Sequence, residues 1–194
     1  FYFLFLYSLL YLFWIFVLDY QKYFKRHVGA MPLKKMNLSD HFVFWGFKLF
    51  HIFLFVGLPI YLLGFTSWII GFVIFTCVAG LVLSLVFQLA HTVEHTSFPQ
   101  PNIETGKLDD EWAVHQIKTT ANFATNNKVV SWLVGGLNFQ IEHHLFPKIS
   151  HVHYPAISKI IRKACEDYGL AYIEYPKVRY AVASHVSFLR QMGR

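Results

Sequence analysis

The chain has 194 residues, of which 55% are hydrophobic, 19% aromatic and only 14% charged, a composition too apolar for an ordinary soluble domain. The formal net charge of +6 is spread over loops and the C-terminal end without a long basic run, which argues against a nucleic-acid partner and favours a membrane-facing cytoplasmic surface. Cys77 and Cys165 fit neither a zinc knuckle nor a disulfide framework, so we expect a reducing compartment.

The chain begins with an uncharged and strongly aromatic segment, residues 1–18. This length is marginal for a membrane span, which needs about 20 residues, and amphipathic rings also favour the membrane interface. A spanning helix and an interfacial helix therefore fit the segment equally well. The sequence starts at Phe1, with neither an initiator methionine nor a basic region before the apolar run, so we expect no signal peptide and a chain that lacks its N-terminal part.

Residues 19–41 are polar, and their basic residues outnumber their acidic ones. Pro32 breaks any long helix in this stretch. Because positively charged loops stay on the cytoplasmic side of a membrane, these residues predict a cytoplasmic loop.

Two long apolar runs follow, and they predict a transmembrane helical hairpin over residues 42–90. The first run carries one formal charge, Lys48, which lies near enough to the cytoplasmic end to snorkel. His51 in the same run has no partner one turn away, so we expect a packed or water-contacting residue. Gly64 predicts a tight turn into the second run, which has no charged residue and returns to the cytoplasmic side.

The part of the chain after the hairpin is soluble in character and predicts mainly helices. Acidic residues at 109–111 precede an expected helix over residues 112–126, in which His115 and Gln116 have structural or hydrogen-bonding roles. The other expected elements are an amphipathic helix over residues 155–168 ended by Gly169, a short strand over residues 172–175 and a weak helix in the tail.

Two histidine groups lie at the membrane edge that the hairpin predicts. His91 and His95 follow the last apolar run, and His143 and His144 stand together further along the chain. Neutral imidazole is the commonest side-chain ligand of transition metals. In a helix His91 and His95 share one face, whereas adjacent histidines point about 100° apart. The two groups must therefore converge to form one metal site, and two metal ions would accommodate the splay.

The motif QIEHHLFP at residues 140–147 is combined with WAVHQ at residues 112–116, with Thr120 and Asn122, and with a histidine motif that ends a transmembrane hairpin. This combination resembles the C-terminal half of the membrane fatty acid desaturases. It is specifically similar to the front-end group, which includes linoleoyl-CoA desaturase-like proteins and whose third histidine box begins with glutamine in place of histidine. The likeness extends to about Pro176, which implies a desaturase domain over residues 1–176 and a C-terminal tail over residues 177–194.

The resemblance implies an all-α membrane protein. Its parts would be an aromatic membrane or interfacial helix at residues 1–18, the transmembrane hairpin at residues 42–90, and a cytoplasmic, mainly helical histidine-box region at residues 91–176. The family carries three histidine boxes that hold two non-haem irons on the cytoplasmic side. Only the third box is present in this sequence, so the resemblance implies that this chain alone is inactive.

The same resemblance implies a role for each residue of the motifs. The implied iron ligands are His143 and His144 together with His91, His95 or both. Gln140 takes a position that is a histidine in other desaturases, where it would orient a water or bind iron weakly. Glu142 and Glu94 would hold the imidazole tautomers.

The implied reaction is the O₂-dependent introduction of a cis double bond into the fatty acyl chain of an acyl-CoA or an acyl-lipid. Electrons would come from an external protein, a ferredoxin or a cytochrome b5, and the enzyme would lie among membrane lipids, in the bacterial inner membrane. A sphingoid-chain desaturase or a related di-iron lipid hydroxylase would use the same histidine geometry. A haem-binding or transport protein fits less well, because the spacing of His91 and His95 does not place two ligands on opposite faces of a haem.

Overall fold

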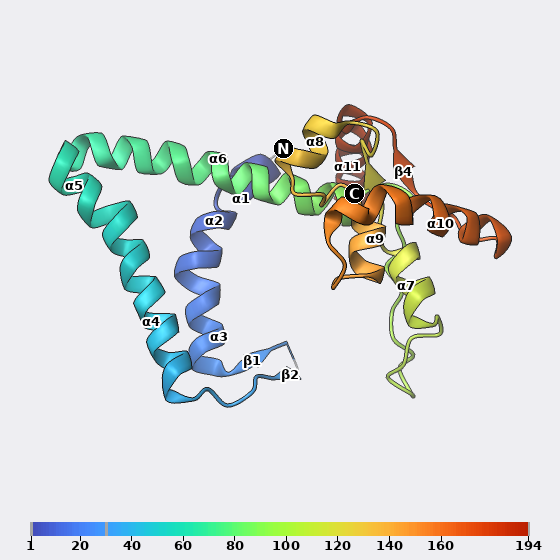
Figure 1. The fold of residues 1–194 in the computed structure, drawn as a ribbon, viewed down its shortest axis with the longest axis horizontal. Helices are drawn as coiled ribbons and strands as arrows, with labels where there is room; N and C mark the ends of the chain where they lie inside the picture. Colours follow the sequence, from blue (N-terminus) through green and yellow to red (C-terminus); the bar gives the residue numbers. More distant parts are fainter. Residues whose placement is uncertain (1, 30, 194) are drawn as a thin grey trace. The chain divides into compact units, whose positions relative to one another are not determined.

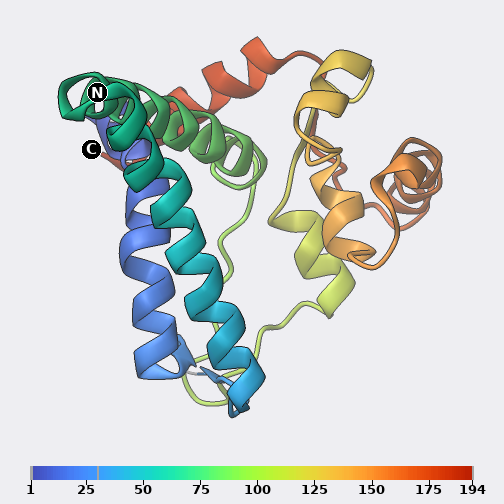
Figure 2. The ribbon, with the colours of Figure 1, turned by 60° about the vertical axis from the view of Figure 1, so that its left-hand side comes forward.

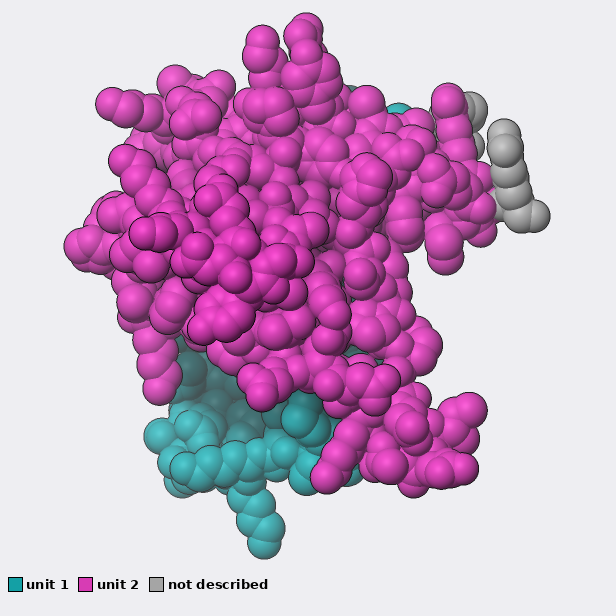
Figure 3. Space-filling model, turned by 90° about the vertical axis from the view of Figure 1, so that its right-hand side faces the viewer, with its two compact units in different colours: residues 1–84 teal, residues 85–194 magenta. Residues whose placement is uncertain are grey.

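The computed structural model describes residues 2–29 and 31–193 (Figure 1). The chain divides into two compact units, residues 1–84 and residues 85–194, which Figure 3 shows in different colours. The boundary falls within helix α6 (Phe65–His91). The described residues are mainly helical, as expected, and they also include two pairs of two-residue strands.

Helical structure in the first unit continues well beyond the aromatic segment. The elements are α1 (Phe3–Ser8), α2 (Leu10–Phe13), the π-helix η1 (Trp14–Leu18) and α3 (Asp19–Lys25). The prediction of a loop over residues 19–41 is therefore wrong for the first seven of these residues, which form α3. The reason is packing against α4 (Leu38–Ile52), where the Tyr23 ring stacks on Phe44 with centroids 4.2 Å apart. Figure 2 shows these two helical segments running side by side.

Helix α3 ends where Arg26 takes a left-handed conformation, with φ of 60°. The short antiparallel pair β1 (His27–Val28) and β2 (Met31–Pro32) follows. Asn37 then begins α4 through reciprocal hydrogen bonds with Asp40, whose backbone N and carboxylate each lie 2.9 Å from their partner atoms on Asn37. This capping box starts the helix four residues before the expected position.

The expected pair of long apolar helices joined at Gly64 is confirmed. The first runs over Leu38–Leu63 as α4, the π-helix η2 (Phe53–Gly57) and α5 (Leu58–Leu63), and the second is α6. Gly64 turns the chain between them with φ of 77°, which favours glycine. These are the two helices of the described residues that are long and apolar enough to cross a membrane, and the aromatic first segment is not among them.

Lys48 is held by partners within the first unit. Its ammonium lies 2.7 Å from the Asp19 carboxylate and 2.9 Å from the carbonyl oxygen of Ile15, and the side chain is only 12% exposed. A charge on an apolar helix is stabilised here by a partner on the neighbouring helix. His51 is packed as expected, with its ring stacked on Phe55 at a centroid distance of 4.7 Å.

Helix α1 packs against α6 at two small residues of α6, Gly80 and Ser84. The Ser84 hydroxyl donates a hydrogen bond to the Tyr7 carbonyl oxygen at 3.1 Å. A Cβ added to Gly80 would lie 2.7 Å from the carbonyl carbon of Ser8, which is too close for real contacts. Only glycine therefore allows this approach of α1 to α6.

We expect Gly80→Ala to separate α1 from α6, because the new methyl group would overlap the backbone of Ser8. Overpacking of this kind costs about 1 to 3 kcal/mol. Thermal unfolding of the purified full-length protein in detergent measures the effect. Gly71→Ala is the matched control on the same helix, because nothing lies within 4 Å of its added Cβ. Equal melting temperatures for the two variants would contradict the close approach.

The second unit places short elements around the end of α6. They are α7 (Trp112–Lys118), β3 (Asn122–Phe123), α8 (Lys128–Leu133), α9 (Gln140–Leu145), the 3₁₀ helix η3 (His151–His153), α10 (Tyr154–Asp167), β4 (Glu174–Tyr175) and α11 (Val178–Met192). Strands β3 and β4 pair in parallel. Helix α10 and strand β4 confirm the amphipathic helix and the short strand expected from the sequence.

Of two further expectations for this unit, one is wrong and one is confirmed. The helix expected over residues 112–126 ends at Lys118, because the backbone of Asn122 bonds to Ile173 in the β3–β4 pairing instead of continuing the helix. The helix expected in the tail is confirmed as the 15-residue helix α11, which buries Ala181, Ser184 and His185.

Two apolar clusters form the core of the second unit. One cluster consists of Leu89 on α6, Ala181 on α11, Phe123 at the end of β3 and Ala124 directly after it. The other surrounds Ile141 on α9, which is fully buried, and brings in α7 and α10 through Ile117, Ile161 and Cys165. Helix α9 is thereby held in the interior of this unit.

Candidate metal centre

Three histidines from two distant parts of the sequence meet in the second unit. His91 is the last residue of α6, and His143 and His144 lie on α9. The ring centroids are 4.9 Å apart for His91 and His144 and 5.9 Å apart for His143 and His144. The two histidine groups therefore converge, as the sequence predicts, through these three members.

His95 does not share a helix face with His91, and that expectation is wrong. Helix α6 ends at His91, because the Thr96 hydroxyl bonds the carbonyl oxygens of His91 and Val93 and the chain turns away. His95 is exposed and adopts a left-handed conformation with φ of 74°. Its side chain makes no hydrogen bond or ring contact with any other described residue.

The Nδ1 atoms of His91 and His144 each face an oxygen that accepts hydrogen bonds. His144 Nδ1 lies 2.8 Å from the amide oxygen of Gln116, and His91 Nδ1 lies 3.4 Å from the backbone carbonyl of Thr119. Because carbonyl oxygens only accept, the proton of each neutral ring sits on Nδ1. The Nε2 lone pair of each ring is then left for a metal ion.

His143 has a hydroxyl group as its partner, from another element. Its Nδ1 lies 3.2 Å from the hydroxyl of Tyr154, the first residue of α10. Burial raises the pKa of Tyr154, so its hydroxyl remains a neutral hydrogen-bonding group. All three rings therefore engage Nδ1 with an oxygen.

The electrostatics of the cluster favour neutral imidazoles. Burial, followed by the neighbouring rings of His91 and His143, lowers the pKa of His144 to about 4. Its ring is consequently neutral at physiological pH, as metal binding requires.

The donor set fits part of a transition-metal site. Neutral nitrogen ligands whose other ring nitrogen is held by an oxygen are typical of such sites. Within residues 2–29 and 31–193, however, no group of three His, Cys, Asp or Glu side chains is placed so that it could hold a metal ion. His91, His143 and His144 therefore do not form a metal site by themselves.

The two glutamates expected beside the imidazoles have other partners. Glu142 is fully buried, and its two carboxylate oxygens accept hydrogen bonds from Asn122 at 2.7 Å and from the Tyr172 hydroxyl at 2.8 Å. Burial raises the pKa of Glu142, while these hydrogen bonds act against the increase. Glu94 accepts a hydrogen bond from Ser187 on α11 at 2.6 Å. Both carboxylates thus bind neighbouring elements together.

Gln140 begins α9 and is only 2% exposed. Within the described part of the chain, no hydrogen bond is formed by its side-chain amide. His115 is similar in one respect, because its Nδ1 is buried and has no hydrogen-bond partner among the described residues.

The sequence indicates a hydrogen-bonding role for Gln116 but does not reveal two other partners of the histidines. Thr119 acts through its backbone carbonyl, which no side-chain motif reports. Tyr154 is the first residue of α10, and the sequence pattern there indicated only the start of an amphipathic helix. Neither residue carried a signal for the site.

Comparison with known proteins identifies relatives of this chain. Residues 1–176 match the fatty acid desaturase family. The chain is 42% identical over 165 residues to the sn-1 linoleoyl-lipid 6-desaturase of Synechocystis sp., a match that covers 84% of this chain and 45% of the relative. It is 36% identical over 183 residues to the acyl-lipid (8-3)-desaturase of Physcomitrium patens, which covers 92% of this chain and 37% of the relative.

A third relative is the Delta(5) fatty acid desaturase A of Dictyostelium discoideum, 32% identical over 168 residues, with 85% of this chain and 36% of the relative covered. The chain spans less than half the length of these curated relatives. No solved structure matches it. Because the family match runs through 176 residues and includes all three converging histidines, the chain belongs to the fatty acid desaturase family.

Proposed function

We propose that this chain is part of a di-iron, O₂-dependent acyl desaturase of the front-end type, which introduces a cis double bond into a fatty acyl chain. The observation that carries the proposal is the convergence of His91, His143 and His144, with Nδ1 of each ring bound to an oxygen. Iron, when bound, supplies the oxidising chemistry that amino-acid side chains lack.

In this proposal the Nε2 atoms of the three histidines hold iron, and their partners fix the ring orientations. We propose His91 rather than His95 as the ligand at the end of α6, because His95 lies on an exposed turn. The amide of Gln140, which has no described partner, contributes a weak ligand or orients a water. The remaining ligands come from the first two histidine boxes of the full-length protein.

We propose an acyl-lipid as the substrate carrier. The relatives from Synechocystis sp. and Physcomitrium patens are named as linoleoyl-lipid and acyl-lipid desaturases. The acyl-CoA form remains the alternative carrier. Electrons come from a ferredoxin or a cytochrome b5 in either case.

Metal analysis and an absorption spectrum of the purified full-length protein test the proposal together. We expect two irons per chain and an absorption spectrum without the Soret band of haem. A Soret band, or the absence of bound iron after reconstitution, would contradict a di-iron centre and favour another class of membrane protein.

We expect Gln116→Ala to weaken iron binding by about 10-fold to 100-fold, because His144 loses the acceptor that holds its Nδ1 proton. Iron content after dialysis against a graded series of chelator concentrations measures the change without relying on activity. Gln116→Glu, which keeps an acceptor oxygen, should recover most of the affinity. Gln100→Ala is the control, because Gln100 is exposed and its amide donates a hydrogen bond to the neighbouring Phe98 carbonyl, away from the histidines. Unchanged iron retention in Gln116→Ala would show that the contact does not orient the ligand.

We further propose that the loop before α4 and the unit after α6 face the cytoplasm, since basic residues concentrate in both. Cysteine labelling in intact cells tests this in a full-length protein whose Cys77 and Cys165 have been replaced. An impermeant reagent should label Phe65→Cys from outside and fail to label Asn37→Cys. The opposite pattern would reverse the orientation.

A further inference from the structure

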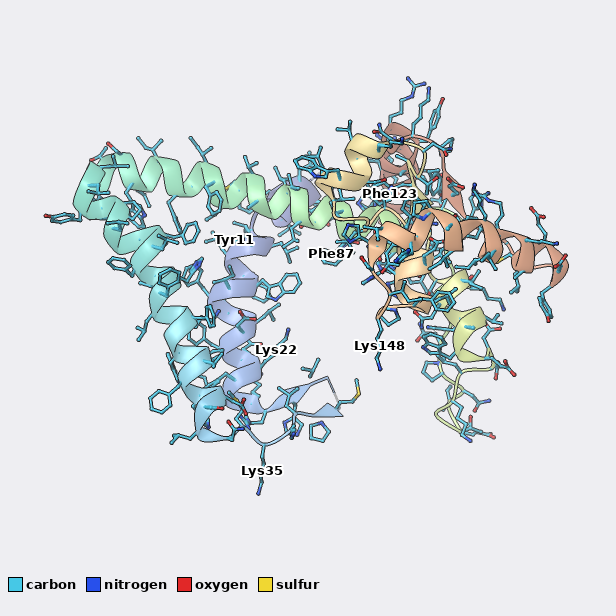
Figure 4. The ribbon with its side chains drawn as sticks, viewed as in Figure 1. Tyr11, Lys22, Lys35, Phe87, Phe123 and Lys148 are labelled. Carbon is cyan, nitrogen blue, oxygen red and sulfur yellow. The ribbon has the colours of Figure 1, made fainter. Side chains whose placement is uncertain are left out.

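A cavity of about 870 Å³ lies within the first unit, beside α3, α4 and the loop that joins β2 to α4. Its lining has a charged part and an apolar part. The charged residues are Asp19, Lys22, Arg26, Lys34, Lys35, Asp40 and Lys48, and the apolar ones include Val43, Phe44, Phe47, Phe50, Leu54 and Phe55. Figure 4 labels Lys22 on α3 and Lys35 in the loop.

The charged part of the cavity is strongly cationic. Both acidic residues are already engaged, Asp19 with Lys48 and Asp40 with the backbone of Asn37. Four cations of the lining, Lys22, Arg26, Lys34 and Lys35, have no ion pair with any described residue. An anion is therefore the ligand that the charged part favours.

The apolar part follows one stripe that runs along α4 and into η2. Val43, Phe47, Phe50 and Leu54 are spaced at four, three and four residues, so they lie on one face of the helix. From Asp40 to Leu54 the helix rises about 21 Å. The stripe belongs to a helix long and apolar enough to cross a membrane, and Phe47 and Phe50 are 71% and 57% exposed.

We propose that this cavity binds an anionic phospholipid of the surrounding bilayer. The phosphate lies against the cations of the charged part, and an acyl chain lies along the stripe from Val43 to Leu54. Basic residues next to a membrane span attract anionic lipid head groups. A soluble anion or an acidic protein would use the charged part and leave the apolar stripe without a partner. The site consists of residues from the first unit and does not depend on the proposed iron ligands.

Binding of fluorescent phosphatidylglycerol to the purified full-length protein tests the charged part. Each cation next to an anionic lipid changes binding about fivefold, so Lys34→Gln combined with Lys35→Gln should weaken it about 25-fold. Both side chains are exposed, so we expect the variant to fold like the parent. Its elution profile in size-exclusion chromatography checks this. The control is Lys107→Gln combined with Lys128→Gln, which changes two exposed lysines of the second unit that have no ion pair with any described residue. This double variant should bind the lipid like the parent.

The apolar part is tested by Phe47→Ala, with Phe65→Ala as a control of similar exposure outside the cavity. We expect only Phe47→Ala to weaken phosphatidylglycerol binding. Equal binding of phosphatidylcholine, or displacement of the lipid by inorganic phosphate or coenzyme A, would overturn the proposal. The proposal would also be wrong if native mass spectrometry of the protein mixed with phosphatidylglycerol found no bound phospholipid.

Discussion

Alanine at His143 or at His144 should abolish product formation by the full-length protein and leave its membrane insertion unchanged. Each ring would supply Nε2 to iron, and each has Nδ1 already held by Tyr154 or Gln116. Loss of groups that support metal ligands costs about 10-fold to 100-fold, and loss of a ligand itself should exceed this range. Fatty acid profiles of cells that express each variant measure the product, and the amount of protein in the membrane fraction measures insertion.

The matched control for these variants is His153→Ala. His153 lies in η3 close to the same region of the sequence, but it is exposed. We expect normal activity from this variant. If either of the first two variants still produced the new double bond at the parental level, the proposed ligand assignment would be wrong.

Asn122→Ala should destabilise the second unit by about 3 kcal/mol, because one buried side chain serves two other buried groups. Its amide donates to the Glu142 carboxylate at 2.7 Å, and its oxygen accepts from the backbone N of Ile141 at 2.9 Å. Alanine leaves both groups without these partners inside the core. A buried carboxylate that loses a donor is penalised more than a neutral group.

Thermal unfolding in detergent, followed by tryptophan fluorescence, measures this loss. Asn126→Ala is the control, since Asn126 is exposed four residues further along the chain and should change stability by less than about 0.5 kcal/mol. A melting temperature of Asn122→Ala equal to that of the control would mean that the network around Glu142 does not hold α9 in place.

Local patterns in the sequence determined the long helices and the turn between them. The two apolar runs have the length of membrane spans, and Gly64 takes the positive φ that its position requires. The adjacent histidines and the motif around them indicated a metal site and a family, and the family is confirmed. Such features depend on residues that are neighbours in the chain, so composition and spacing are enough to reveal them.

Only the tertiary structure decided which groups meet. Lys48 pairs with Asp19 from 29 positions away, and Gln116 reaches His144 from 28 positions away. Thr119 contributes a backbone oxygen that the sequence does not mark as functional, and His95 leaves the cluster because the helix ends before it. These outcomes depend on how distant segments pack and on which buried polar groups find partners. Periodicity along the chain does not encode that pairing.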